Sequence, residues 1–354
     1  MIKNRYEVIG VMSGTSLDGI DLAHCMLSVS DRGEWSFTIG KAETVPYSES
    51  WKARLQDGIK ASKEEMILLN KAYTSYLRSV ILEFVQRNRL EHLDAICSHG
   101  HTIWHQPNDG YTLQIGNLPS ISKGLTSKIV CDFRVQDVKL GGQGAPLVPI
   151  GDRLLFSNYD YCLNLGGFAN CSFESNGMRM AYDICPVNIV LNHFAELLGV
   201  PFDSEGMIAA SGQVDTRLLS ALNELPFYKE LAPKSLGFEW VQQFVFPLMA
   251  ASKISVEDKI ATFTAHVAQQ IASQFSDGGT VLVTGGGAYN SFLIEQLRLL
   301  KKLQLVLPEP TLIEYKEALV FGLLGVLKLR DEVNCLSSVT GANRDHSSGV
   351  IFTP

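Results

Sequence analysis

Apolar and polar positions follow the same plan in both halves of the chain. Each half opens with three apolar, strand-like runs, at 6–13, 19–29 and 35–46 in the first and at 159–165, 169–174 and 178–183 in the second. In the first half, a long helical pattern at 63–89 and a strand at 93–98 come next. In the second half, the helical patterns lie at 187–198, 255–275, 289–301 and 312–330.

This repeated plan predicts two α/β domains, each with a mixed sheet flanked by helices. We place the boundary near 145–158, so that a first domain covers 1–150 and a second covers 151–354. The helix at 312–330 could return to the first domain. Because each half also has a glycine-containing hairpin after its first strand, two such hairpins facing each other would form a nucleotide cleft.

Composition restricts the classes of function. With 46% hydrophobic and 19% charged residues, no apolar run long enough to span a membrane and no signal-peptide core, we expect a cytoplasmic protein without a membrane partner. A net charge of −7 without a basic cluster argues against nucleic-acid binding. The seven cysteines form no CxxC pair and lie mostly in apolar runs, as free thiols do in a reducing compartment.

The segment VIGVMSGTSLDGID, residues 8–21, is a candidate phosphate-binding hairpin. Gly14 and Gly19 let the backbone approach an anion, and the hydroxyls of Thr15 and Ser16 add hydrogen-bond donors. The carboxylates of Asp18 and Asp21 can hold hydrated Mg²⁺. On these residues alone, an ordinary tight hairpin is an equally good interpretation.

A second glycine segment, TVLVTGGGAYNSFLIEQL at 280–297, is a buried strand that leads through three glycines into a helix. Gly285, Gly286 and Gly287 would let an adenosine or ribose lie on the backbone, and Asn290 could cap the helix or contact the ligand. The segment matches neither the GxGxxG nor the GxxxxGK[ST] pattern, which weighs against Rossmann and P-loop folds.

Three histidines stand in SHGHTIWHQP, residues 98–107. A metal site on His99, His101 and His105 is one interpretation, but no HExxH is present and Gly100 after a strand argues against a helix. We favour a loop that lines a polar pocket for a sugar-like ligand.

The segment CDFRVQDVKLGGQGAPLVP, residues 131–149, places polar side chains after an apolar strand. Arg134 could hold a carboxylate with two hydrogen bonds, and Gln143 could bind hydroxyl or amide groups. The alternative is a structural Asp–Arg ion pair and a turn. In AYDICPVN, residues 181–188, Asp183 at a strand end is equally a candidate general base or a helix N-cap.

Together these segments resemble the anhydro-N-acetylmuramic acid kinase family, of the actin, Hsp70 and sugar-kinase fold group. GVMSGTSLDGID looks like the family's first phosphate loop, and SHGHTIWHQP looks like its SHGQTxxHxP segment with His101 in place of Gln. Further similar segments, in family order, are LQIGN at 113–117, DFR at 132–134, GGQGAPLVP at 141–149, NLGGFAN at 164–170, GGGAYN at 285–290, EALVFGLL at 317–324 and VTGA at 339–342.

The resemblance implies an α/β fold of two duplicated ribonuclease-H-like domains with the nucleotide cleft between them. It implies an ATP- and Mg²⁺-dependent kinase that opens 1,6-anhydro-N-acetylmuramic acid with water and phosphorylates O6, giving N-acetylmuramic acid 6-phosphate in peptidoglycan recycling. It also implies a cytoplasmic homodimer whose substrate is a small sugar.

The resemblance assigns a role to individual residues. Asp183 matches the family's catalytic acid, which takes a proton from the attacking water. ATP would contact both hairpins and the triple glycine, through Gly14, Thr15, Ser16, Leu17, Asp18, Gly19, Ile20, Asp21, Gly166, Gly167, Asn170, Gly285, Gly286, Gly287 and Asn290. The sugar would contact His99, His105, Arg134, Gln143, Gly144 and Asn188.

Two segments depart from the family pattern. The family's DTGPGN reads DICPVN at 183–188, which loses both glycines and predicts a differently shaped loop with a smaller, more apolar pocket. The family's PKSTGRE reads PKSLGFE at 233–239, with Leu236 and Phe238 in place of a hydroxyl and a cation.

Two further hypotheses stay open. The altered DICPVN loop leaves room for a catalytically impaired nucleotide-binding paralogue that works as a sensor or binding module. The fold and the histidines suggest a chaperone-like ATPase or metalloprotease-like relative, in which His99, His101 or His105 would bind zinc or iron.

Overall fold

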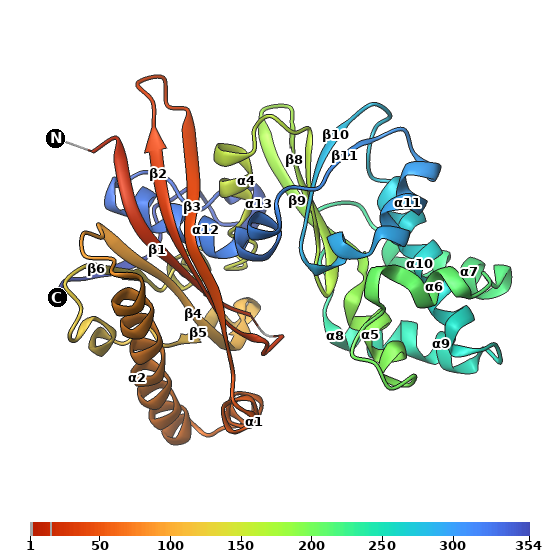
Figure 1. Cartoon of the computed structure of the whole chain (residues 1–354), viewed down its shortest axis with the longest axis horizontal. Helices are drawn as coiled ribbons and strands as arrows, with labels where there is room; N and C mark the ends of the chain where they lie inside the picture. Colours follow the sequence, from red (N-terminus) through yellow and green to blue (C-terminus); the bar gives the residue numbers. More distant parts are fainter. Residues whose placement is uncertain (1–2, 15) are drawn as a thin grey trace. The chain divides into compact units, whose positions relative to one another are not determined.

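The computed structural model describes residues 3–14 and 16–354, which divide into two compact units. Unit 1 comprises Met1–Leu155 and Tyr315–Pro354, and unit 2 comprises Phe156–Glu314. Each unit contains one mixed sheet with helices (Figure 1). None of the described helices is long and apolar enough to cross a membrane.

The sheet of unit 1 begins with three antiparallel strands, β1 (Arg5–Ser13), β2 (Gly19–Val29) and β3 (Trp35–Pro46). On the other side of β1, β4 (Ala95–Gln106) and then β6 (Lys128–Cys131) run parallel to it. Antiparallel β5 (Tyr111–Ile115) pairs with β4, and antiparallel β12 (Val350–Phe352) pairs with β6 at the sheet edge.

The sheet of unit 2 repeats this order. Antiparallel β7 (Tyr161–Leu165), β8 (Phe168–Ser175) and β9 (Met178–Pro186) come first, and β10 (Thr280–Thr284) and β11 (Gln304–Val306) then extend the sheet parallel to β7. The order β3-β2-β1-β4-β6 in unit 1 therefore corresponds to the order β9-β8-β7-β10-β11 in unit 2. This confirms the predicted fold class of two duplicated α/β domains.

Strand β4 corrects the prediction of a loop at 98–107. The strand continues to Gln106 because Gly100 adopts φ +74, the register shifts between Thr102 and Trp104, and the second half of the strand pairs with β5. A Cβ atom at Gly100 would lie 2.5 Å from the carbonyl oxygen of Ile115. Gly100 thus lets the strand bend and continue.

Helices cover both faces of the unit 1 sheet. The long α2 (Lys63–Asn88) starts at a capping box between Ser62 and Glu65 and packs in one core with Ile9 and Val11 of β1. Residues Val8 and Gly10 point to the opposite face, where they approach α12 (Pro310–Leu329). The other helices are α1 (Glu49–Gly58), η1 (Pro107–Asp109), η2 (Pro119–Ser122), α3 (Val135–Lys139), α4 (Pro149–Leu155) and α13 (Ser337–Thr340).

The close contact of α12 with β1 gives a stability prediction. A Cβ atom at Gly10 would lie 1.7 Å from the carbonyl oxygen of Ala318, so Gly10→Val must separate helix and sheet. We expect a loss of about 1–3 kcal/mol or more in the free energy of unfolding, measured by urea denaturation. Gly322→Ala is the matched control, because its Cβ would lie 3.3 Å from Val8 Cγ2 and alanine favours the helix. Equal effects of the two substitutions would contradict this packing.

The C-terminal residues belong to unit 1, which differs from the expected second domain of 151–354. Strand β12 extends the unit 1 sheet, Thr340 Oγ1 donates to Asp137 Oδ1 at 2.7 Å, and Ser348 Oγ donates to the carbonyl oxygen of Phe133 at 2.6 Å. Hydrophobic periodicity located the helix at 312–330, but it carries no information on these long-range contacts of the C-terminal residues.

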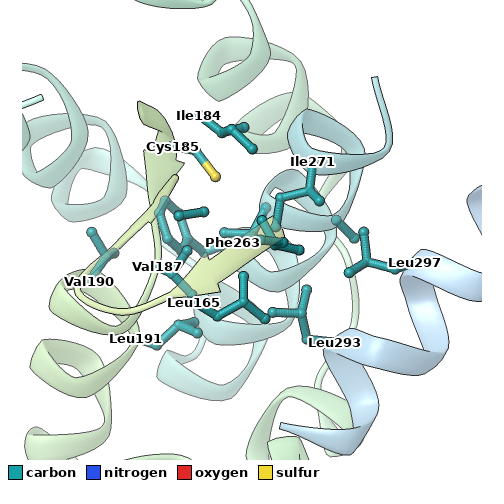
Figure 2. Close-up of a cluster of buried hydrophobic side chains, with 14 of the residues drawn as sticks. Leu165, Ile184, Cys185, Val187, Val190, Leu191, Phe263, Ile271, Leu293 and Leu297 are labelled. Carbon is teal, nitrogen blue, oxygen red and sulfur yellow. The ribbon is translucent and has the colours of Figure 1, made fainter. Parts of the chain in front are cut away.

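The helices of unit 2 surround a separate hydrophobic core. Figure 2 shows part of this core, in which Leu165 of β7, Phe263 of α10 (Val256–Ala272) and Leu293 of α11 (Ser291–Leu300) lie together. The remaining helices are α5 (Asn188–Glu196), η3 (Ser204–Gly206), α6 (Met207–Ser211), α7 (Thr216–Asn223), η4 (Pro226–Lys229), α8 (Phe238–Trp240), η5 (Val241–Val245), α9 (Phe246–Ala251) and η6 (Gly286–Tyr289).

Candidate active site

Asp183 lies near the end of β9, opposite Asn170 of β8. Its carboxylate is held by the loop before α8: Oδ2 accepts hydrogen bonds from the Leu236 amide at 2.8 Å and from Ser235 Oγ at 3.2 Å. The Asp183 amide in turn donates to the Lys234 carbonyl oxygen at 3.1 Å. The side chain is therefore fixed through one oxygen.

The electrostatics of Asp183 suit a general base. Burial raises the pKa of this carboxyl above its ordinary value, while the Leu236 amide and the Ser235 hydroxyl lower it in part. Within the described residues, no hydrogen bond to Oδ1 is found, and the residue is partly exposed. A fixed, partly desolvated carboxylate with one available oxygen can accept a proton from a bound water.

The structure excludes the N-cap alternative for Asp183. The N-cap residue of α5 is Val187, and no side chain caps that helix. The Val187 amide instead donates to the Gly167 carbonyl oxygen at 2.8 Å. Asp183 is thus separated from the helix by the rest of the DICPVN segment.

The substituted residues of DICPVN point into the core of unit 2. Ile184, Cys185 and Val187 are at most 1% exposed, and Figure 2 shows them among the buried side chains. The register shift between β8 and β9 gives Ile184 no partner on β8, and Val187 has a negative φ of −132, so this position does not need the positive φ that favours glycine. The side chains that replace the family's glycines therefore fill the core, and the expected narrowing of the pocket beside Asp183 does not follow from them.

The second departure, PKSLGFE, keeps its contact with Asp183. Leu236 donates through its backbone amide, so this hydrogen bond does not depend on the side chain that differs from the family. Phe238 is 43% exposed and its ring lies 6.2 Å from that of Phe246.

Two glycine loops lie at strand ends in the sheet of unit 2, the sheet that also carries Asp183. Gly285, with φ +81, and Gly287 lie against Leu165, where added Cβ atoms would clash at 2.9 and 2.7 Å. By contrast, a Cβ atom at Gly286 or Gly167 would meet no atom closer than 3.8 Å. Gly285 and Gly287 therefore permit close packing against Leu165, whereas Gly286 and Gly167 leave open space above the backbone.

Two asparagines at these loops make contacts within the protein. Asn290 Oδ1 accepts the Leu293 amide at 2.9 Å, so that Asn290 caps α11. This is the first of the two roles expected for it. Asn188, expected beside the sugar, donates from Nδ2 to the Leu165 carbonyl oxygen at 3.1 Å and joins the two glycine loops.

The hairpin of unit 1 connects β1 with β2 between Ser13 and Gly19. Ser16 and Asp18 are exposed, and Leu17 has φ +61. The side chain of Ile20 is buried in the core, so only the backbone of Ile20 could reach a ligand.

The other hairpin residues make contacts within unit 1. The Gly14 carbonyl oxygen accepts the Leu17 amide at 3.4 Å, and Gly19 lies against β3. Asp21 accepts a hydrogen bond from Thr44 Oγ1 at 2.6 Å. Thr15 lies outside the described residues.

Arg134 is held by groups of the protein. Its Nε donates to His99 Nε2 at 2.8 Å, and its NH1 group donates to the carbonyl oxygen of Gly144 at 2.6 Å. His99 Nδ1 donates to the Gly100 carbonyl oxygen at 2.9 Å, and both burial and the Arg134 charge lower the pKa of His99. His99 is therefore a neutral acceptor that orients Arg134.

The other two histidines also have protein partners. His101 Nδ1 lies 2.8 Å from Ser13 Oγ, which is 2.7 Å from the Tyr47 hydroxyl. His105 Nδ1 lies 2.9 Å from Thr112 Oγ1. His101 thereby supports the residue that precedes the hairpin. The Gln143 side chain is exposed and its amide donates to the Thr340 carbonyl oxygen at 2.8 Å.

One charged residue beside the candidate site residues of unit 1 was missed in the sequence analysis. Glu317 of α12 carries a carboxylate whose charge interacts with Arg134 and with Asp21. Desolvation by the surrounding protein atoms and the charge of Asp21 raise the pKa of Glu317, whereas Arg134 lowers it. The motif EALVFGLL contains this residue, but as a motif it indicates only the family.

In each of the two units, three antiparallel strands are extended by two parallel strands, which defines a duplicated α/β protein. The family model described as "Anhydro-N-acetylmuramic acid kinase" matches residues 6–354. The chain therefore belongs to the anhydro-N-acetylmuramic acid kinase family, a family of kinases that act in sugar metabolism.

Individual relatives agree with this membership. Proteins named anhydro-N-acetylmuramic acid kinase are similar to this chain in Variovorax paradoxus (33% identity, 97% of this chain and 98% of that protein) and in Vibrio cholerae (32% identity, 99% of both). Among solved structures, the "Activator of the 2-Hydroxyisocaproyl-CoA Dehydratase from Clostridium difficile with bound ADPNP" aligns with 92% of this chain and 96% of that chain, at 13% identity and a TM-score of 0.42.

Proposed function

We propose that this protein is an ATP-dependent kinase that opens the 1,6-anhydro bridge of 1,6-anhydro-N-acetylmuramic acid and phosphorylates O6. The observation that carries the proposal is the fixed carboxylate of Asp183 with its raised pKa and available Oδ1. Family membership supports the choice of substrate and its place in peptidoglycan recycling.

In the proposed reaction, Asp183 Oδ1 takes a proton from a water that attacks C1 of the sugar. The water oxygen becomes the C1 hydroxyl, the C1–O6 bond breaks, and O6 accepts the γ-phosphoryl group of ATP. Asp183 then releases its proton to solvent. The products are N-acetylmuramic acid 6-phosphate and ADP.

We assign the nucleotide to the glycine loops. Gly167 and Gly286 leave open space above the backbone, which suits the close approach of a phosphate or a ribose. The resemblance adds the unit 1 hairpin, where Asp18 and Asp21 supply the carboxylate oxygens that Mg²⁺ prefers. When bound, Mg²⁺ would neutralise charge on the transferring phosphoryl group.

We assign the sugar to Asp183 and, by resemblance, to Arg134 and Gln143. Because His99 uses both ring nitrogens within the protein, we propose that it acts by orienting Arg134. The same resemblance is the ground for proposing a homodimer that works in the cytoplasm. Sedimentation of the purified protein tests the dimer.

The direct test is ADP release by the purified protein. We expect release with 1,6-anhydro-N-acetylmuramic acid and little release without sugar or with N-acetylmuramic acid, which lacks the anhydro bridge. If the protein bound ATP but turned over neither sugar, the result would instead support the hypothesis of an impaired nucleotide-binding paralogue. Because the substituted DICPVN side chains are buried in the core, the structure gives that alternative no specific support.

The contacts of Asp183 predict how activity depends on pH. The base must be deprotonated, so kcat/KM should fall as the pH drops through the raised pKa of Asp183. Because Ser235 lowers this pKa, Ser235→Ala should move the acid limb of the profile to higher pH. Ser211→Ala, which removes an exposed hydroxyl of α6, should leave the profile unchanged. An unchanged limb in Ser235→Ala would contradict the role of Asp183 as the base.

A further inference from the structure

A buried cluster of three metal-ligating side chains lies in unit 1, on residues to which the proposed function gives no role. Asp137 comes from α3, and Cys335 and His346 come from the C-terminal segment around α13. Their side chains are at most 6% exposed, and the candidate ligand atoms all lie within 4.8 Å of one another. The two C-terminal residues form a β-bridge, which fixes their backbones side by side.

The hydrogen bonds of His346 select the tautomer that binds metals. Its Nδ1 lies 3.2 Å from the carbonyl oxygen of Arg344, which can only accept, so Nδ1 carries a proton, and in the neutral imidazole Nε2 carries a lone pair. Nε2 is buried and has no hydrogen-bond partner among the described residues. It lies 3.6 Å from Asp137 Oδ1.

This separation fits a shared cation better than a hydrogen bond. An N–H···O hydrogen bond has a length of about 2.7–3.2 Å, whereas ligand bonds of about 2.0–2.2 Å at a tetrahedral ion place two ligand atoms roughly 3.4 Å apart. Asp137 Oδ1 already accepts from Thr340 Oγ1 and Oδ2 from the Gly144 amide, so the carboxylate is held in place and Oδ1 keeps a further lone pair. A lone pair facing a carboxylate in a buried site is unfavourable without a positive charge between them.

We propose that Asp137, Cys335 and His346 form a binding site for a zinc ion. Thiolate, imidazole and carboxylate are all established types of zinc ligand, and the thiolate disfavours Mg²⁺ and Ca²⁺. Binding releases the Cys335 thiol proton to solvent. Because a cysteine must lose its thiol proton to bind a metal, zinc affinity should rise with pH.

The site would attach the C-terminal segment to the candidate sugar-binding loop. Asp137 also accepts the amide of Gly144, whose carbonyl oxygen binds Arg134. Zinc would therefore stabilise both the C-terminal segment and the loop that holds Arg134. The proposal does not depend on the proposed function, since its residues and its test involve no sugar or ATP.

The test uses the full chain purified without a histidine tag. After treatment with a chelator, we expect one Zn²⁺ per chain in calorimetric titration and a higher thermal unfolding midpoint when Zn²⁺ is added. Co²⁺ should give a thiolate-to-cobalt charge-transfer band. Both signals should be lost in Cys335→Ala and His346→Gln and kept in the matched controls Cys25→Ala, a buried thiol outside the cluster, and His92→Gln, an exposed imidazole.

Three results would overturn the proposal. The first is that the folded wild-type chain binds no Zn²⁺ saturably. The second is a cobalt complex without a thiolate band, and the third is metal binding that survives both cluster substitutions. Circular dichroism of each variant shows whether it is folded. If a variant is not folded, the titration of the wild-type chain still decides whether the zinc site exists.

Discussion

Asp183→Asn is expected to lower kcat with 1,6-anhydro-N-acetylmuramic acid by about 10²- to 10⁴-fold, the usual contribution of a positioned general base. Asparagine has the same shape, and its amide oxygen can still accept the Leu236 and Ser235 hydrogen bonds, so the loop should stay in place. ATP affinity and the thermal unfolding midpoint should change little. The measurement is steady-state ADP release at saturating sugar.

Asp277→Asn is the matched control, because it removes one exposed carboxylate from the same unit. It should keep wild-type kcat. If Asp183→Asn retained activity within a few-fold of wild type, another group would have to take the proton of the water. Loss of ATP binding in Asp183→Asn would instead indicate a structural role.

Gly286→Leu is expected to weaken ATP binding by at least about tenfold, which corresponds to about 1.4 kcal/mol. The first atom that an added Cβ would meet is Asn188 Nδ2 at 3.8 Å, so the substitution should not disturb the fold. The larger side chain would occupy the space that we assign to the nucleotide. Calorimetric titration with ATP and Mg²⁺ measures the loss.

Two further substitutions test the cause of this effect. Gly286→Ala should weaken ATP binding less, because its side chain is smaller. Gly287→Ala should instead lower the thermal unfolding midpoint, since its Cβ would lie 2.7 Å from Leu165 Cβ. Unchanged ATP affinity in Gly286→Leu would contradict the assignment of this loop to the nucleotide.

Much of the fold could be predicted from the sequence because its signals are local. Three antiparallel strands close in sequence give clear apolar runs, and the helix expected at 63–89 is α2 at Lys63–Asn88, where Ser62 and Glu65 supply a capping box. The duplication was visible because both halves repeat this order of signals. The strand predicted at 93–98 is shorter than β4, because a glycine such as Gly100 weakens a strand locally, whereas in the structure pairing with β5 stabilises the bend.

The orientation of side chains in the candidate site could not be predicted in the same way. The sequence of DICPVN shows which glycines are replaced, but only the register shift at Ile184 shows that the new side chains enter the core. Likewise, the contact of Leu236 with Asp183 is made by a backbone amide, which any side chain would leave possible. Asp137, Cys335 and His346 are far apart in the sequence and meet only through the fold.

The most direct measurement is the identification of the sugar product by NMR together with the amount of ADP formed. With 1,6-anhydro-N-acetylmuramic acid, ATP and Mg²⁺, the proposed function requires N-acetylmuramic acid 6-phosphate and ADP in equal amounts, and no such product with Asp183→Asn. ADP formed without phosphorylated sugar, or an intact anhydro bridge in a phosphorylated product, would contradict it.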